Sequence, residues 1–226
     1  KQLGDVTVAA SQMPDNLEAL ATAFVTNLLQ LEMEKLAAAE FFAASKWGTD
    51  TTLAGTDQWS DYANSDPIKD VDVAKRTIRR NTGAVSGLKG FIGASGWEKL
   101  KEHPLILDKY KHTQVGVMTE ALVASVLGLD GIEVGYAVEN TAAEGASFVG
   151  SDIWTDNIII AVVNNPSLMV ANGGVNFVWD ERGNVPWAVD MYYEEKIRST
   201  IVRAFTHIVP LVLSAQHGYR YADLIA

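Results

Sequence analysis

The sequence predicts an α+β fold, in which one long helix and a block of shorter helices precede most of the strands. Three observations lead to this prediction. Residues 14–47 carry apolar side chains at three- and four-residue steps with few helix breakers. Residues 70–127 repeat that helical spacing in shorter pieces, and from Ile132 onward the pattern becomes the alternation typical of β-strands. A regular βαβ series would instead alternate the two patterns along the whole chain.

The composition bounds the class of protein. Of the 226 residues, 48% are hydrophobic and 20% charged, which is ordinary for a globular chain and excludes global disorder. The absence of cysteine excludes disulfides and thiolate zinc sites. A formal charge of −10 argues against a protein that wraps nucleic acid with a basic face. The longest apolar run, residues 158–163, is far shorter than the roughly 18 residues of a membrane helix.

The segment 14–47 is expected to be a single helix. Pro14 suits a first helical position, Glu18 suits the positive end of the helix, and Gly48 follows near its end. At 1.5 Å per residue such a helix is about 50 Å long, several times the usual length. A helix of this length is expected to span a whole module.

Residues 48–67 read as a polar loop and a plausible domain boundary. Asp70–Thr82 then reads as an amphipathic helix, with Asp70 and Asp72 expected to cap its start. One face of this helix is basic and consists of Lys75, Arg76, Arg79 and Arg80. That face could simply be solvated, or it could contact nucleic acid or a neighbouring subunit.

Further helices and the strands follow in order. After the glycine-rich residues 83–96, two short helices are expected at Trp97–Glu102 and Leu105–Tyr110, broken at His103–Pro104, and a third at Met118–Leu127. The strands are expected at Ile132–Val138, Ile158–Val163, Val175–Trp179, Ala188–Tyr193 and Ile197–Val209, with residues 180–184 as a hairpin connection.

The sequence offers no catalytic constellation. Gly90–Gly96 has the glycine content of a phosphate-binding loop but lacks its Lys-Ser/Thr pair, so a turn is the better interpretation. The four histidines show no metal-ligand spacing. Ser214, His217 and Asp223 could be drawn as a triad, but no nucleophile elbow surrounds the serine. We therefore predict no enzyme activity, no metal and no cofactor.

Several stretches, taken together and in order, resemble the major capsid protein family of tailed bacteriophages, whose fold is shared with encapsulin shells. The middle run Ile132–Gly145 is the most specific and is similar to the family's "VG-x-A-x-x-NTA-x-EG" stretch. The other stretches are Trp97–Lys111, with its "HP, apolar, apolar, Asp, basic" pattern, then Met118–Leu122, Pro166–Met169 and Phe177–Trp179. The resemblance covers about residues 14–213.

This resemblance implies an architecture. Residues 1–67 would hold a remnant of an extended loop, the spine helix and the following loop of a peripheral domain. Residues 68–172 would form an axial domain, and residues 173–226 would return as peripheral-domain strands and a C-terminal segment packing near the axial domain. Residues 6–10 alternate as one strand of the extended loop should.

The resemblance also implies a function. The chain would be a structural virion protein, assembled in the bacterial cytoplasm through pentamers and hexamers into an icosahedral shell around double-stranded DNA. Its partners would be copies of itself, scaffold, portal or decoration proteins, and the packaged DNA without sequence specificity, with no membrane. Candidate inter-subunit contacts are Lys75, Arg79, Arg80, Asn140, Thr141 and Glu144.

The sequence departs from the family at the front, where members carry an N-terminal arm and a complete extended loop. We expect the chain alone to be monomeric or weakly associating for that reason. Three alternatives stay open at this point. They are an encapsulin-type shell around a cargo enzyme, a small-molecule enzyme that uses the Gly90–Gly96 turn, and a monomeric binding module such as a decoration protein.

Overall fold

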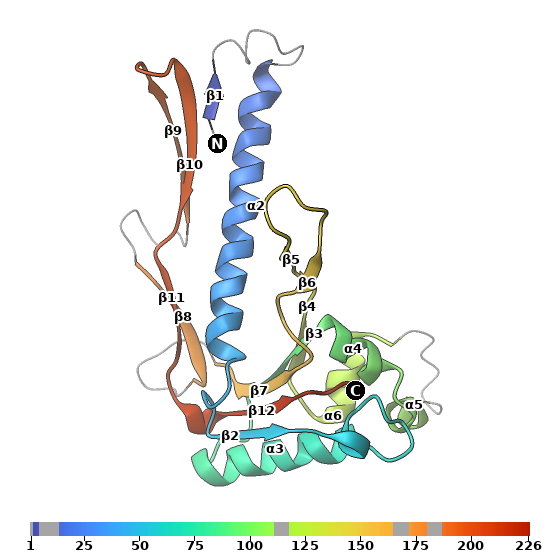
Figure 1. Cartoon of the computed structure of the whole chain (residues 1–226). Helices are drawn as coiled ribbons and strands as arrows, with labels where there is room; N and C mark the ends of the chain where they lie inside the picture. Colours follow the sequence, from blue (N-terminus) through green and yellow to red (C-terminus); the bar gives the residue numbers. More distant parts are fainter. Residues whose placement is uncertain (1, 5–13, 111–117, 165–171, 180–186) are drawn as a thin grey trace. The chain divides into compact units, whose positions relative to one another are not determined.

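The computed structural model describes residues 2–4, 14–110, 118–164, 172–179 and 187–226, and Figure 1 shows its elements. The chain divides into two compact units. Unit 1 comprises Lys1–Leu36 and Asn176–Val209, and unit 2 comprises Ala37–Val175 and Pro210–Ala226. Each unit is thus built from two stretches that lie far apart in the sequence.

The long helix, α2, spans Pro14–Phe41 and ends before the predicted residue 47. Its 28 residues correspond to about 42 Å. The helix stops because the Trp47 indole N–H donates to the Phe41 carbonyl oxygen at 2.7 Å, which satisfies a terminal acceptor. Ser45 takes a positive φ of 62°, and its backbone N–H donates to the Asp50 carboxylate at 2.9 Å.

Unit 1 pairs α2 with an antiparallel sheet in the order β1–β10–β9. The strands are β1 (Gln2–Gly4), β9 (Ala188–Glu194) and β10 (Ser199–Phe205). Ala21 of the helix and Val202 of β10 are buried against each other, with Leu17, Val25 and Val189 around them. This core is small, so much of the apolar surface of α2 stays uncovered within the unit.

The predicted strand Ile197–Val209 is two strands, because the chain changes partners after Phe205. Phe205 ends the pairing of β10 with β9, whereas the His207 carbonyl oxygen accepts the backbone N–H of Trp179 at 2.9 Å. The second piece, β11 (Ile208–Val212), pairs with β8 (Gly174–Val178). The predicted hairpin at 180–184 and strand at 6–10 lie outside the described residues.

Unit 2 is organised around a mixed five-stranded sheet in the order β2–β12–β7–β3–β4. These strands are β2 (Thr49–Thr52), β3 (Leu88–Gly93), β4 (Gly131–Gly135), β7 (Ile158–Val162) and β12 (Gly218–Ala222). β12 runs parallel to β2 and antiparallel to β7, and β3 runs parallel to β4. The last strand of the chain therefore lies inside a sheet formed mostly by much earlier residues.

Two of these strands occupy segments predicted to be loops. β2 lies within the expected polar loop 48–67, and β3 lies within the glycine-rich stretch 83–96. In β3, close packing favours glycine over a larger residue, since a Cβ on Gly90 would meet Leu129 at 3.3 Å. Three of the glycines interpreted as turn residues therefore belong to a buried strand and the helix that follows it.

The helices of unit 2 follow the predicted order with shifted ends. They are α3 (Pro67–Thr82), α4 (Ala94–Lys101), α5 (Pro104–Tyr110) and α6 (Glu120–Leu127). Asp66 caps the start of α3 and its carboxylate accepts the Lys69 backbone N–H, so the predicted capping by Asp70 and Asp72 is wrong. Asp70 instead accepts the Trp59 indole N–H at 2.9 Å. Gly83 ends the helix with a φ of 77°, where glycine carries no steric cost.

The core of unit 2 lies between the sheet and the helices. Val71, Ala74 and Ile78 of α3 are buried in one cluster with β7 residues Ile158 and Ile160. On the opposite side of β12, a Cβ on Gly218 would overlap the Trp47 ring. A separate two-stranded hairpin, β5 (Val138–Asn140) and β6 (Gly150–Asp152), extends from the sheet region (Figure 1).

Candidate assembly surfaces

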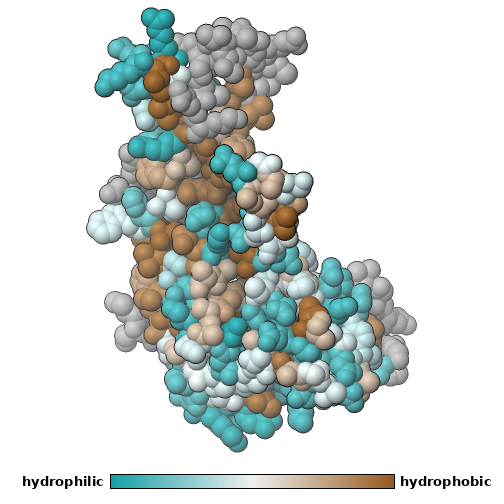
Figure 2. Space-filling view, in the orientation of Figure 1, coloured by the Kyte–Doolittle hydropathy of each residue, from teal (hydrophilic) through white to brown (hydrophobic). Residues whose placement is uncertain are grey.

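Unit 1 exposes an unusual number of large apolar side chains. Those on α2 are Leu20, Phe24, Leu28 and Leu36, and those on the strands and their connections are Phe177, Val178, Trp179, Met191, Tyr192, Tyr193, Ile197 and Val209. Trp179 is 69% and Leu20 66% exposed. Figure 2 shows hydrophobic residues gathered over α2, β8 and β11. Contiguous apolar surface of this kind marks an interaction site rather than an ordinary solvated face.

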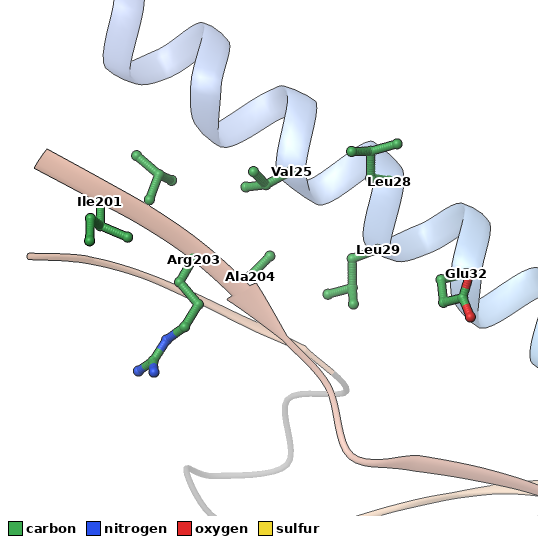
Figure 3. Close-up of a pocket in the computed structure, with 8 residues that line it drawn as sticks. Val25, Leu28, Leu29, Glu32, Ile201, Arg203 and Ala204 are labelled. Carbon is green, nitrogen blue, oxygen red and sulfur yellow. The ribbon is translucent and has the colours of Figure 1, made fainter. Parts of the chain in front are cut away.

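A first apolar groove lies between α2 and β10. It has a volume of about 480 Å³ and is lined by Val25, Leu28, Leu29, Glu32 and residues 201–204. Figure 3 shows Val25 and Leu29 directed toward the strand, while Arg203 lies on the strand's other side. There Arg203 pairs with Asp190 of β9 at 2.7 Å. The lining of the groove is therefore mostly apolar, although Glu32 and Arg203 are among the residues that line it.

A second groove of about 510 Å³ lies at the Leu36 end of unit 1. Its walls are residues 177–179 at the end of β8 and residues 206–209 at the start of β11. Leu36, Trp179 and Val209 are all substantially exposed. Both grooves are open and apolar, which suits a protein surface or an extended chain better than a small polar molecule.

The exposed apolar residues of α2 were not predicted as a site. Leu20, Phe24 and Leu28 recur every four residues, beside the stripe of Leu17, Ala21 and Val25 that packs on the sheet. Two neighbouring stripes make the helix apolar over more of its circumference than one packing face needs. That excess is the sequence signal that could have revealed the surface.

The structure places the predicted basic residues of α3 in two different settings. The Lys75 ammonium donates to the Leu127 carbonyl oxygen at 2.5 Å and pairs with Asp72 at 2.8 Å. Lys75 thus closes the C-terminal end of α6 within the chain. Arg79 and Arg80 are exposed, and within the described residues no ion pair involves either of them.

Asn140, Thr141 and Glu144 lie together at the tip of the β5–β6 hairpin. The Asn140 side-chain oxygen accepts the backbone N–H groups of Ala142 and Val149, at 3.1 and 3.0 Å. The Thr141 backbone N–H donates to the Val149 carbonyl oxygen at 2.9 Å. These bonds fix an exposed loop, on which Phe148 is 70% exposed. Asn140 therefore shapes the loop, whereas Glu144 is free to face outward.

His103 is fully buried and holds the start of α5. Its Nδ1 accepts the Leu105 backbone N–H at 3.3 Å, so Nδ1 carries no proton. Its Nε2 then donates to the Ser65 hydroxyl at 3.1 Å, and that hydroxyl donates to the Asp61 carbonyl oxygen at 2.7 Å. Burial lowers the pKa of His103, with Asp66 acting in the opposite direction. The contact that His103 makes at the start of α5 thus requires its neutral form.

Protonating His103 is expected to destabilise unit 2. Because the pKa is lower in the folded chain than the unfolded value of about 6.5, the stabilisation is complete above pH 6.5 and is lost as pH falls toward the folded pKa. The free energy of unfolding should therefore decrease as the pH falls below about 6.5, by at most about 1.4 kcal/mol per pH unit for this one proton. Urea unfolding at several pH values measures this slope. His103→Asn, which keeps an acceptor for Leu105, should flatten it, and an unchanged slope in that variant would refute the assignment.

The structure does not bring the residues of the candidate Ser214–His217–Asp223 triad together. The Ser214 hydroxyl and His217 Nδ1 are hydrogen-bonded at 2.7 Å in a short turn, but Asp223 lies beyond the far end of β12. A five-residue strand separates the two ends by roughly 16 Å. Within the described ranges, no group of three acidic or histidine side chains is arranged to hold a metal ion. Of the helices described, none has both the length and the apolar character that crossing a membrane requires.

The fold is that of phage capsid proteins. A crystal structure of a phage-related protein from Bordetella bronchiseptica matches with a TM-score of 0.80 and 21% identity, over 99% of this chain and 73% of that chain. The capsid structure of the cyanophage P-SCSP1u matches with a TM-score of 0.66 and 12% identity, over 98% of this chain and 70% of that one. The prediction of a tailed-phage capsid fold is confirmed.

Two proteins that are similar to this chain in sequence are named major capsid proteins. The chain is 32% identical over 209 residues to the major capsid protein of Burkholderia phage BcepMu, covering 90% of this chain and 65% of that protein. It is 33% identical over 131 residues to the major capsid protein of Pseudomonas phage JBD67, covering 55% of this chain and 40% of that protein. No family model matches the chain. The resemblance to phage major capsid proteins is therefore confirmed, and the chain spans less than two thirds of the length of these relatives.

Proposed function

We propose that this chain is the shell-forming part of a major capsid subunit, which assembles with copies of itself into pentamers and hexamers and then into an icosahedral shell. The relatives support a structural role in a capsid. The observation that carries the proposal is the apolar surface of unit 1, with its two grooves and its exposed Trp179. A soluble monomer gains nothing from such a surface, whereas a subunit that repeats one contact many times depends on it.

The proposal assigns the remaining exposed features to contacts between copies. In it, residues 68–172 form the axial domain, and the peripheral domain combines the long helix with strands from residues 173–226. The hairpin tip with Asn140, Thr141 and Glu144 faces a neighbour near the ring axis. Arg79 and Arg80 face a neighbour through α3, while Lys75 supports that face from within the chain.

The proposed content of the shell is double-stranded DNA held without sequence specificity. A subunit with a charge of −10 repels phosphate overall, which allows a densely packed genome to be confined without being bound tightly. In this role the protein belongs to the virion, is assembled in the host cytoplasm, and meets scaffold, portal or decoration proteins. The alternative with the same fold is an encapsulin-type shell around a cargo enzyme.

Electron microscopy of the complete gene product that contains this chain tests the proposal. We expect closed shells tens of nanometres across, with five- and sixfold capsomers. Nuclease-protected DNA in particles from infected or induced cells would support genome packaging, and a co-purifying enzyme would support the encapsulin alternative. A product that remains monomeric at all concentrations would overturn both.

A further inference from the structure

The two ends of α3 carry opposite charge on the surface of unit 2. The N-terminal end, together with the loop before it, is acidic, and the C-terminal end is basic. Asp57 lies in the loop before the helix and Asp66 caps its start, and both are exposed. Arg76, Arg79 and Arg80 lie on the C-terminal half of the helix, and all three are exposed to solvent. The interval from Asp66 to Arg79 corresponds to about 20 Å of helix. Figure 2 shows hydrophilic residues along the lower edge of the view, where Figure 1 places α3.

Neither end is neutralised within the described part of the chain. Burial raises the pKa of Asp70, and the nearby charges of Asp66 and Asp57 raise it further, while the Trp59 hydrogen bond and Lys69 only partly offset them. The three carboxylates thus crowd one another at the start of α3. At the other end, no ion pair among the described residues engages Arg76, Arg79 or Arg80.

A helix with two uncompensated ends of opposite sign suits a head-to-tail contact. The arginines of one copy and the aspartates of the next would form a heterologous contact, and such contacts close into rings when the rotation between copies permits. A single exposed ion pair stabilises little, about 0–1 kcal/mol, but several pairs in a network favour one partner and orientation over others. The chain is acidic overall, so a second copy presents many carboxylates with which the three arginines can pair.

We infer that the Arg76–Arg79–Arg80 face of α3 docks on the Asp57–Asp66 end of α3 in a second copy of this chain, and so sets the direction of subunits around the ring. This inference rests on the proposed shell assembly and names the two surfaces that meet. It assigns the arginine face to another subunit and not to DNA phosphates.

Charge exchange in the complete gene product tests the pairing. The first variant, Arg79→Glu with Arg80→Glu, reverses the basic end. The second, Asp57→Lys with Asp66→Asn, reverses or removes the acidic charges and keeps a capping side chain at position 66. Each variant alone should lower the yield of shells about tenfold or more, because like charges then oppose each other at every contact. The four-residue combination should restore assembly, since its ends are again complementary.

The outcomes separate this inference from the proposed function. Wild-type protein that forms no shells would defeat the proposed function itself. Shells from the wild type and from both single-end variants would overturn only the pairing. The pairing would also be overturned if both variants were defective and their combination did not restore assembly. If the arginine variant formed intact shells that no longer retained DNA, the arginine face would be assigned to DNA instead. Lys99→Glu with Lys109→Glu, which changes net charge equally on α4 and α5, should assemble like the wild type.

Discussion

Gly93→Ala is expected to destabilise unit 2 by about 3 kcal/mol or to prevent its folding. A Cβ on Gly93 would overlap the Thr155 carbonyl oxygen and lie 2.6 Å from that of Trp154. Both obstacles are backbone atoms, so no side-chain rotation relieves the overlap. Gly93 itself has a φ of −70°, which alanine adopts freely, and the cost is therefore steric alone. The midpoint of urea unfolding, followed by tryptophan fluorescence, measures the change.

Gly131→Ala is the matched control, because Gly131 lies in the neighbouring strand β4 and pairs with Lys89 of β3. A Cβ there would meet only the flexible Lys89 side chain, at 3.9 Å. The control should unfold within about 1 kcal/mol of the wild type. Equal stability of the two glycine variants would show that the close approach between β3 and residues 154–155 does not constrain the fold.

Periodicity was sufficient where an element packs on one regular face. Asp70–Thr82 was predicted as a helix and α3 is Pro67–Thr82, because Val71, Ala74 and Ile78 repeat at helical spacing toward the core. The apolar run at 158–163 was predicted as a buried strand, and all five residues of β7 are buried between neighbouring strands. In both cases the local sequence alone contains the packing information.

Periodicity failed where distant residues decide the structure. Gly218–Ala222 has an arginine between two tyrosines and lacks the continuous apolar run that is typical of a buried strand. All five of its residues are nevertheless buried. Arg220 is tolerated there because Asp50 of β2, 170 positions away, pairs with it at 2.6 Å. Polar Thr49–Thr52 likewise becomes a strand only because β12 offers its edge.

The same division applies to the candidate surfaces. The exposure of Arg79 and Arg80 could be predicted from helical spacing, because Ile78 and Ala74 mark the opposite face. The engagement of Lys75 with Leu127 could not, since it joins two helices 52 positions apart. The exposed apolar stripe on α2 was also missed, because sequence spacing does not show which of two adjacent stripes meets the small sheet of unit 1.

Leu28→Asp is expected to abolish shell assembly while the chain stays folded. Leu28 is 51% exposed and lines the groove between α2 and β10, so the isolated chain loses little when it becomes polar. In an assembled contact, the same change removes about 1 kcal/mol of apolar burial and places an unpaired carboxylate in an apolar groove, which costs more. Electron microscopy and sedimentation of the complete gene product give the particle yield.

Gln30→Asp is the control that separates the groove from the helix. Gln30 is exposed on the same helix, and aspartate adds the same charge at a similar cost in helix propensity without entering the groove. A ring repeats each contact five or six times, so a deficit at the groove multiplies, whereas a change outside the contact does not. Leu28→Asp should therefore fail to form shells under conditions where Gln30→Asp forms them. Equal shell yields from the two variants would show that the groove faces solvent in the particle, and that the apolar surface of unit 1 does not carry the assembly.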